Sequence, residues 1–455
     1  MDMTYGLTVC EVVMLVIGSV FSQIFRSVID DVNWTPSSIF YGGEPGVWFD
    51  PSDLTTLFQD NLGATPVTAP AQTVGMMLDK SGRGNHATQA TLAQRPIYGI
   101  NPIVGTRNLL TYSSWSDAVA GTPGTAPTGW AFFFGTGAQT SLVGGLDEMG
   151  AQAIKFDATV GQRIAYNQQV NVVAGNTYSL SADVVSVSGP GGVVVNIASG
   201  TAVGTATNVV SPSTGRVTAR YVCTTSGTVG LRLGLGITVG VTGTSSITFK
   251  KPQFEIGTTA TAYQKVVTQY EVTQTGIQSI GYLAFDGVDD GMVTGTITPG
   301  IDKAQVFVGV RKLSDAAQKV VAEMSATIAS NNGAFALTAP NSAAANYNFS
   351  SKGTTQTDNV VTTYTAPITS VISGLGDIAG ASNLIRVNGS QVGSTLTTQG
   401  TGNYLAYPLY IGRRGGSTLP YNGRIYSLIA RFGSNLTANQ ITSTETWVNG
   451  KTGAY

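Results

Sequence analysis

From about residue 35 onward, short runs of Val, Ile, Thr, Tyr and Phe alternate with clusters of Gly, Ser, Asn and Pro. Residues 192–197 (GVVVNI) and 304–310 (AQVFVGV) are examples of these runs. Such runs, bounded by turn residues, are typical of β-sandwiches. No segment repeats with a period of roughly 20 to 50 residues, which argues against a solenoid or β-helix. The sequence therefore predicts an all-β fold made of two jelly-roll β-sandwich domains, preceded by a short N-terminal α-helix.

Turn and helix signals refine this expectation. Gly accounts for 57 of 455 residues, well above the usual frequency of about 7%. Asn388 and Gly389 directly follow the apolar run 384–387, which predicts a type I′ hairpin turn. A helix is predicted near residues 436–447, where Thr437 can cap the first turn.

The charge composition limits the classes of function. Charged residues make up 11% of the chain and the net charge is −1, which argues against a nucleic-acid partner held by phosphate neutralisation. One His and two Cys are too few for a zinc site built from His and Cys. Cys10 and Cys223 are therefore predicted to be free thiols, although a disulfide between them stays open.

The first residues differ from the rest of the chain. Glu11 and Arg26 confine the charge-free stretch to residues 12–25, which is shorter than the roughly 20 residues that span a bilayer. We expect no membrane span, but rather a helix that trimerises the chain, because β-branched residues at both core positions favour trimers. A helix buried in the chain's own core and a membrane anchor are the alternatives. The apolar seam consists of Val13, Ile17, Val20, Ile24 and Val28.

Several later segments resemble, in order, the motifs of laminin-G-like domains of the concanavalin A-like lectin fold. They are residues 78–87 (LDKSGRGNHA), 282–290 (YLAFDGVDD), 384–389 (LIRVNG), 407–413 (YPLYIGR) and 421–425 (YNGRI). In that family the first two motifs lie tens of residues apart, whereas about 200 residues separate Asn85 from Asp286 here. The resemblance therefore implies a lectin-like sandwich that is interrupted by an insertion.

The insertion has a resemblance of its own. Residues 108–113 (NLLTYS) and 254–263 (FEIGTTATAY) resemble the two ends of carbohydrate-binding jelly-roll modules that are common in bacteriophage virion proteins. A sandwich with neighbouring termini can sit in a surface loop of another domain. The expected domains are an anchor helix and linker at 1–45, a split laminin-G-like sandwich at 46–107 and 266–455, and an inserted jelly roll at 108–265.

Residues 46–60 (GVWFDPSDLTTLFQD) and 447–453 (WVNGKTG) resemble the beginning and end of lectin-like proteins of tailed bacteriophages. This implies a virion appendage on the phage particle surface, such as a tail fibre, spike or head fibre. Its N-terminus would attach it to other virion proteins, and its sandwiches would contact a host-surface glycan. Two other classes stay open. One is a purely structural head, collar or tail component, and the other is a bacterial adhesin, which predicts a secretion signal that this N-terminus lacks.

Candidate binding residues fall into two groups. Asp286, Asp289 and Asp290 form the densest acidic group, which could hold Ca²⁺ or could instead hydrogen-bond its own turn. Sugars are recognised by exposed aromatic faces together with polar hydrogen-bonding groups. The candidates for carbohydrate binding are Trp115, Trp130, Tyr166, Arg413, Arg414 and Tyr421, with a position in the core as the alternative for each aromatic residue.

We expect no catalytic residues. Glycoside hydrolysis normally needs two facing carboxylates, and the strand-borne Glu-x-Asp-x-Glu set used by glucanases of the lectin fold does not occur. The adjacent pair Asp147 and Glu148 follows two glycines and is predicted to be a solvated turn. His86 is the only possible histidine base, and no Gly-x-Ser-x-Gly nucleophile motif accompanies it. The sequence thus predicts a binding or structural protein rather than a glycan depolymerase.

Overall fold

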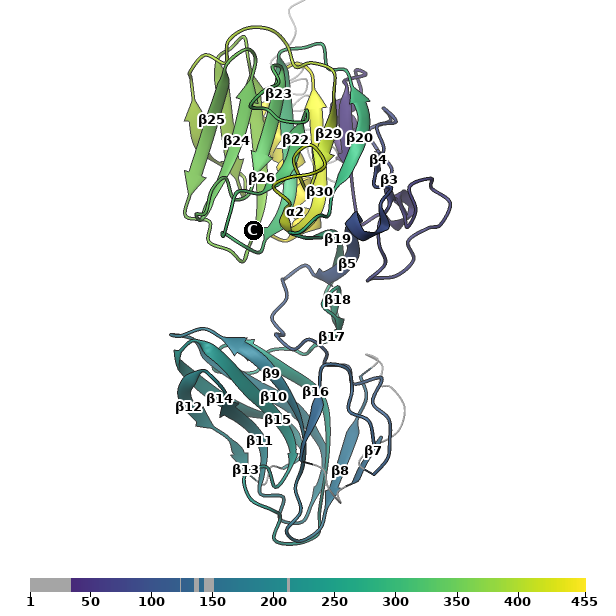
Figure 1. Cartoon of the computed structure of the whole chain (residues 1–455), viewed down its shortest axis with the longest axis vertical. Coiled ribbons are helices and arrows are strands. Elements are labelled where there is room, and N and C mark those ends of the chain that lie inside the picture. Colours follow the sequence, from purple (N-terminus) through teal and green to yellow (C-terminus); the bar gives the residue numbers. More distant parts are fainter. Residues whose placement is uncertain (1–33, 123, 135–138, 143–150, 211–212) are drawn as a thin grey trace, which may run out of the picture. The chain divides into compact units, whose positions relative to one another are not determined.

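The computed structural model describes residues 34–122, 124–134, 139–142, 151–210 and 213–455 (Figure 1). The predicted N-terminal helix, Cys10 and the Asp147–Glu148 pair lie outside these residues. The chain forms two compact units. Unit 1 contains Met1–Thr68, Thr73–Ile97 and Tyr282–Tyr455, and unit 2 contains Ala69–Gln72 and Tyr98–Gly281. Unit 2 therefore interrupts unit 1 in the sequence, and the expected domain boundaries near 107 and 266 both lie within unit 2.

Unit 1 is a β-sandwich of two mainly antiparallel sheets. The first has the order β19-β30-β21-β26-β27-β28, with β1 also paired to β30; the second has the order β2-β3-β4-β20-β29-β22-β23-β24-β25. The strands of the first sheet are β1 (Gly46–Phe49), β19 (Ser279–Asp286), β21 (Lys303–Lys312), β26 (Ile368–Asp377), β27 (Ser382–Val387), β28 (Ser390–Thr395) and β30 (Asn422–Phe432). Those of the second are β2 (Leu57–Phe58), β3 (Met76–Met77), β4 (Ala87–Thr88), β20 (Met292–Ile297), β22 (Val320–Met324), β23 (Ala334–Thr338), β24 (Asn346–Lys352), β25 (Gln356–Thr362) and β29 (Tyr407–Ile411).

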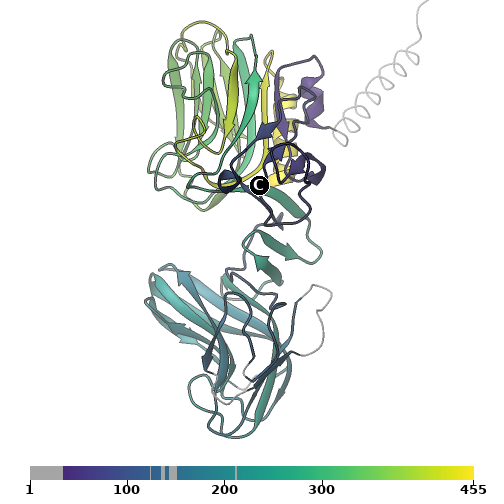
Figure 2. The same ribbon diagram turned by 45° about the vertical axis from the view of Figure 1, so that its right-hand side comes forward.

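Aromatic side chains from both sheets fill the core of unit 1. The ring of Phe335 on β23 lies 6.0 Å from that of Phe432 on β30, and the ring of Tyr404 lies 5.7 Å from Phe432. Figure 2 shows the beginning of this unit (purple) beside its C-terminal strand (yellow), where Gly46 of β1 pairs with Arg431 of β30.

In the described ranges, one α-helix and three short 3₁₀-helices accompany the strands: η1 (Pro36–Phe40), η2 (Leu54–Thr56), η3 (Leu92–Gln94) and α2 (Ala438–Thr452). The prediction of a helix capped by Thr437 is confirmed, because Thr437 and Gln440 form a capping box. Val448 of α2 packs against Phe307 and Ile429 of the first sheet. The helix is further anchored by Glu445, which pairs with Arg386 at 2.8 Å and accepts from Ser373. Among the described residues, no helix is long and apolar enough to cross a membrane.

Unit 2 is a second β-sandwich. One sheet has the order β12-β14-β10-β16-β8-β7 and the other β13-β11-β15-β9-β6. The strands are β6 (Ala131–Phe134), β7 (Gln139–Leu142), β8 (Ile154–Ala158), β9 (Ile164–Val172), β10 (Thr177–Ser188), β11 (Val193–Ser199), β12 (Val203–Thr207), β13 (Val209–Val210), β14 (Gly215–Thr225), β15 (Gly227–Leu235) and β16 (Ser245–Ile256). Strands β5 (Ile97–Pro102), β17 (Gln264–Thr268) and β18 (Glu271–Gln274) complete the list. The prediction of an all-β fold with two sandwiches is confirmed.

Alternating side chains explain the core of unit 2. Along β15, Leu231 and Leu233 are buried in the core, whereas Gly230, Arg232 and Gly234 take the intervening positions and face outward. Cys223 is a buried free thiol on β14, and its Sγ donates to the carbonyl of Thr225.

Candidate functional site

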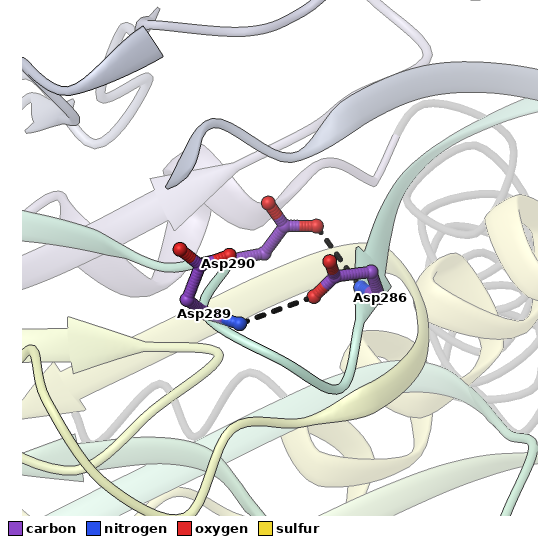
Figure 3. A group of neighbouring side chains, drawn as sticks. All are labelled: Asp286, Asp289 and Asp290. Carbon is purple, nitrogen blue, oxygen red and sulfur yellow. Dashed lines mark hydrogen bonds between the residues drawn. The ribbon is translucent and has the colours of Figure 1, made fainter. Parts of the chain in front are cut away.

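Three aspartates meet in the loop between β19 and β20 (Figure 3), where ligand oxygens of Asp286, Asp289 and Asp290 lie within 4.8 Å of one another. Two of these carboxylates bind the backbone of their own turn. The Oδ1 of Asp286 accepts from the N–H groups of Val288 at 2.7 Å and Asp289 at 3.3 Å. The Oδ2 of Asp290 accepts from the N–H of Asp286 at 2.9 Å. The loop is thus held together by its own carboxylates.

Asp290 is the buried member of this group and is 6% exposed. Burial is the main cause that raises its pKa to about 7, and the charges of Asp286 and Asp289 add to the effect. The nearby guanidinium of Arg413 acts in the opposite direction. Burial therefore favours the protonated form of Asp290 relative to an ordinary aspartate.

The loop fits a structural turn better than a calcium site. Ca²⁺ takes about six to eight oxygen ligands, but the carbonyl of Gly287 accepts from the ammonium of Lys319 at 3.4 Å. One oxygen each of Asp286 and Asp290 is already engaged by the turn. Among the described residues, no carboxylate, His or Cys from a second loop joins the three aspartates. The hydrogen bonds therefore favour the turn-forming alternative.

The other candidates in unit 1 do not form a sugar-binding surface. Tyr421 is fully buried, and its ring packs near Phe285. Arg413 is buried as well, and its Nη2 donates to Gln94 at 2.8 Å. Arg414 is partly exposed, but its Nε is paired with the buried carboxylate of Glu323 at 2.7 Å. These side chains stabilise the loops around them and present no free face to a glycan.

Trp115, Trp130 and Tyr166 lie in the core of unit 2 and are at most 6% exposed. The ring of Trp115 meets Trp130 edge-on at 5.5 Å and Tyr166 at 5.8 Å. The indole N–H of Trp130 donates to the carbonyl of Tyr112. Because a sugar stacks on an exposed ring face, these three residues are corrected from candidate ligand contacts to core residues.

A bulge in β6 brings other aromatic rings to the surface. Phe132 pairs with Tyr166 and packs against the core, and the register shifts before Phe134 pairs with Ala165. Phe133 is the extra residue of this bulge and is 37% exposed. Its ring contacts that of Phe134, with 4.3 Å between the centroids. The break in alternation places neighbouring aromatic residues at the outer side of the sheet.

A polar row crosses the same outer face. Arg232 of β15 pairs with Asn196 of β11 on one side and with Asn167 of β9 on the other. The guanidinium of Arg232 lies over the ring of Phe133 at 3.5 Å from the ring centroid. We call the side chains of Phe133, Phe134, Asn167, Asn196 and Arg232 the Phe133–Arg232 face.

Within the described part of the chain, two buried polar atoms of this face have no hydrogen-bond partner: Oδ1 of Asn167 and Nε of Arg232. A further bond, from Nη1 of Arg232 to Oδ1 of Asn196, is long at 3.4 Å. The absence of a side chain at Gly230 lets the Asn167 amide pack over it, since a Cβ there would lie 2.9 Å from Oδ1 of Asn167. Buried polar groups are normally satisfied, so this face has unused hydrogen-bonding capacity beside an exposed aromatic ring. The sequence alone does not reveal the face, because its residues come from four strands that are separated in the sequence.

A second aromatic surface lies along α2 in unit 1. A groove of about 430 Å³ is lined by Trp34, Thr442, Ser443, Thr446 and Trp447. Trp447 packs edge-on against Trp48 at 5.4 Å. All five groove residues are at least partly exposed among the described residues, which begin at Trp34. This α2 groove is the alternative location for a bound sugar.

His86, the one possible histidine base, has a structural role. Its Nδ1 accepts from the backbone N–H of Asp79 at 3.0 Å. Asp79 in turn accepts from the N–H groups of Trp48, Ser81 and Asn85. The motif around His86 thus ties β1 to the loop that follows β3.

No family model and no curated protein matches this chain. Solved structures show weak likeness. A heptameric SAP-like pentraxin from Limulus polyphemus is 13% identical over 35% of this chain and 78% of that chain, with a TM-score of 0.28. The CBM40 of a Ruminococcus gnavus IT-sialidase, bound to α2,3-sialyllactose, is 12% identical over 32% and 84%, with a TM-score of 0.26. The receptor-binding domain of botulinum neurotoxin D is 9% identical over 36% and 43%, with a TM-score of 0.30. Likenesses at this level assign neither a family nor a ligand to the chain.

Proposed function

We propose that this chain is a non-enzymatic glycan-binding protein and that the Phe133–Arg232 face of unit 2 is its binding site. The observation that carries the proposal is the exposed ring of Phe133 beside hydrogen-bonding atoms that have no partner among the described residues. Binding sites for small ligands combine aromatic side chains with a few convergent polar groups. A sugar ring offers C–H groups to the former and hydroxyls to the latter.

The geometry of the face suits an extended saccharide. Arg232, Asn167 and Asn196 lie in register across three neighbouring strands, so that their polar groups form a row across the sheet. A hydroxyl that reaches the buried Oδ1 of Asn167 would supply the donor that this atom lacks among the described residues. A ring stacked on Phe133 would lie beside this row.

In this proposal the face binds a glycan without hydrolysing it. The strands β6, β9, β11, β13 and β15 contain no Asp or Glu. Because glycoside hydrolysis normally uses a pair of carboxylates, this sheet face provides no residues for general acid and base. The proposal assigns recognition, not cleavage, to the face.

We propose that the chain is part of a bacteriophage particle. The resemblance of residues 46–60 and 447–453 to lectin-like tailed-phage proteins supports a virion fibre or spike. The N-terminal residues would attach the chain to other virion proteins and join three copies. A structural decoration protein of the same location is the alternative, and it predicts no glycan affinity.

A glycan array probed with the full chain tests this function. Wild type is compared with Phe133→Ala and with Val185→Ala, a control on the opposite sheet whose side chain is also exposed. We expect binding above background that Phe133→Ala lowers at least tenfold and Val185→Ala leaves unchanged. A folded wild-type protein that binds no glycan would support the structural alternative, and release of reducing ends from a bound polysaccharide would refute the non-enzymatic assignment.

A further inference from the structure

We infer that the saccharide bound by the Phe133–Arg232 face is acidic, with a carboxylate that pairs with Arg232. This inference rests on the proposed function and names the chemical class of its ligand. Uronic and sialic acids belong to that class, because each presents a carboxylate beside hydroxyl groups.

The first argument is that the charge of Arg232 has no counterion among the residues that the structure describes. Burial lowers the pKa of the Arg232 guanidinium, and no carboxylate of the described residues contributes an opposing effect. By comparison, Arg216 in the same unit is paired with Asp183 at 3.1 Å. A desolvated charge is costly unless it is paired. A ligand carboxylate would supply the missing partner.

The second argument is the sign of charge over the whole sheet. Its five strands contain one charged residue, Arg232, and no Asp or Glu. Arg163, directly before β9, adds a second cation whose guanidinium lies 5.0 Å from the centroid of the Phe134 ring. One arginine on these strands, a second directly before β9 and no carboxylate on the strands favour the approach of an anionic saccharide over a neutral one.

The third argument concerns two polar side-chain atoms of the face that have no hydrogen-bond partner among the described residues. Nε of Arg232 requires an acceptor, whereas Oδ1 of Asn167 requires a donor. Because Gly230 has no side chain, both polar side chains can pack over it: a Cβ there would lie 2.9 Å from Oδ1 of Asn167 and 3.6 Å from Nη2 of Arg232. A carboxylate and a neighbouring hydroxyl on one sugar ring that reach these two buried atoms would satisfy this acceptor and donor requirement together.

The Phe133 ring fixes where the anion can bind. The ring covers one face of the Arg232 guanidinium, so the carboxylate must approach the N–H edge, where charge-assisted hydrogen bonds form. The neutral part of the same sugar then remains close to the exposed part of the ring. Arg232 and Phe133 thus act together on one residue of the glycan.

The test uses the full chain and polymers offered in two forms. Polygalacturonate, alginate, hyaluronan and polysialic acid are each immobilised as the native polymer and as the carboxyl-reduced polymer, beside a panel of neutral glycans. Binding is measured for wild type, Arg232→Gln, Phe133→Ala and Arg220→Gln. Arg220 is an exposed arginine on β14 of the opposite sheet and controls for the loss of one positive charge.

We expect wild type to bind at least one native polymer tenfold or more tightly than its reduced form, and to lose this preference as salt is raised. Arg232→Gln should abolish the preference, and Arg220→Gln should retain it. Binding of neutral glycans that depends on Phe133, with no preference for native polymers or no effect of Arg232→Gln, would overturn the inference and leave the proposed function intact. The absence of binding to every polymer and every neutral glycan would instead overturn the proposed function and the inference together.

Discussion

The guanidinium of Arg232 lies 3.5 Å from the centroid of the Phe133 ring, although the two residues belong to strands that do not pair. In the order β13-β11-β15-β9-β6, strand β9 separates them. The Arg232 side chain therefore crosses β9, where Asn167 is its paired neighbour. This crossing joins the aromatic bulge to the polar row and makes one continuous face.

Loss of the Phe133 ring should weaken glycan binding without unfolding the protein. Phe133→Ala removes an exposed ring and the stacking partner of Arg232, and stacking of this kind contributes about 0.5 to 2 kcal/mol. We expect the Kd to rise by about tenfold in isothermal titration, with an unfolding midpoint close to that of wild type. An unchanged Kd would remove Phe133 from the site.

A substitution in the core of unit 2 should instead lower the free energy of unfolding. Trp115 is fully buried between Trp130 and Tyr166, so Trp115→Ala should destabilise unit 2 by about 3 to 5 kcal/mol. Urea unfolding followed by tryptophan fluorescence measures this, with Val185→Ala as the exposed control. A loss below about 1 kcal/mol would contradict the placement of Trp115 in the core.

The ion pair between α2 and the sheet should anchor that helix. Glu445 is 1% exposed and pairs with the partly exposed Arg386, and it also accepts from Ser373. Glu445→Ala leaves Arg386 and the buried Ser373 hydroxyl without their carboxylate partner and should cost about 1 to 3 kcal/mol. Proteolysis near residues 438–452 should accelerate in the variant. Wild-type stability together with wild-type proteolysis would argue against this anchor.

The aspartate loop should make unfolding depend on pH in a defined direction. The folded-state pKa of Asp290 is about 7, against an ordinary value of 3.8. Between these values the folded state binds more protons than the unfolded state, so this group lowers stability as pH rises from about 4 to about 7. Asp290→Asn removes that contribution while keeping an oxygen acceptor for the N–H of Asp286.

Chemical denaturation at about pH 5 and about pH 8 measures the effect. The free energy of unfolding of wild type should fall more across this interval than that of Asp290→Asn. Calcium serves as a second readout at the same loop, and millimolar Ca²⁺ should leave the wild-type midpoint unchanged. A rise with Ca²⁺ that disappears in Asp290→Asn would establish a metal site.

Short sequence motifs predicted those parts of the fold that depend on hydrogen bonds and backbone angles of neighbouring residues. Thr437 begins α2 because its side chain satisfies the N–H of Gln440. Asn388 and Gly389 both have positive φ between β27 and β28, as the hairpin turn requires. Each of these features depends on a few consecutive residues, which a sequence displays directly.

The site could not be predicted in the same way. Phe133 and Phe134 are adjacent and would point to opposite faces of a regular strand, yet the bulge in β6 brings their rings to 4.3 Å between centroids. The contact between Phe133 and Arg232 depends on the order of strands in a sheet, which alternation does not reveal. Likewise, Arg413 and Tyr421 are buried by packing across the sandwich. Their residue types alone suggested contacts to a sugar, whereas the structure buries both side chains.

Hydroxyl-radical footprinting with and without saturating glycan tests the location of the site most directly. Oxidation of Phe133, an exposed ring on unit 2, is compared with oxidation of Trp447 in the α2 groove of unit 1. The account predicts that glycan slows the oxidation of Phe133 severalfold and leaves that of Trp447 unchanged. Protection of Trp447 with unchanged oxidation of Phe133 would place the sugar in the α2 groove and contradict the account.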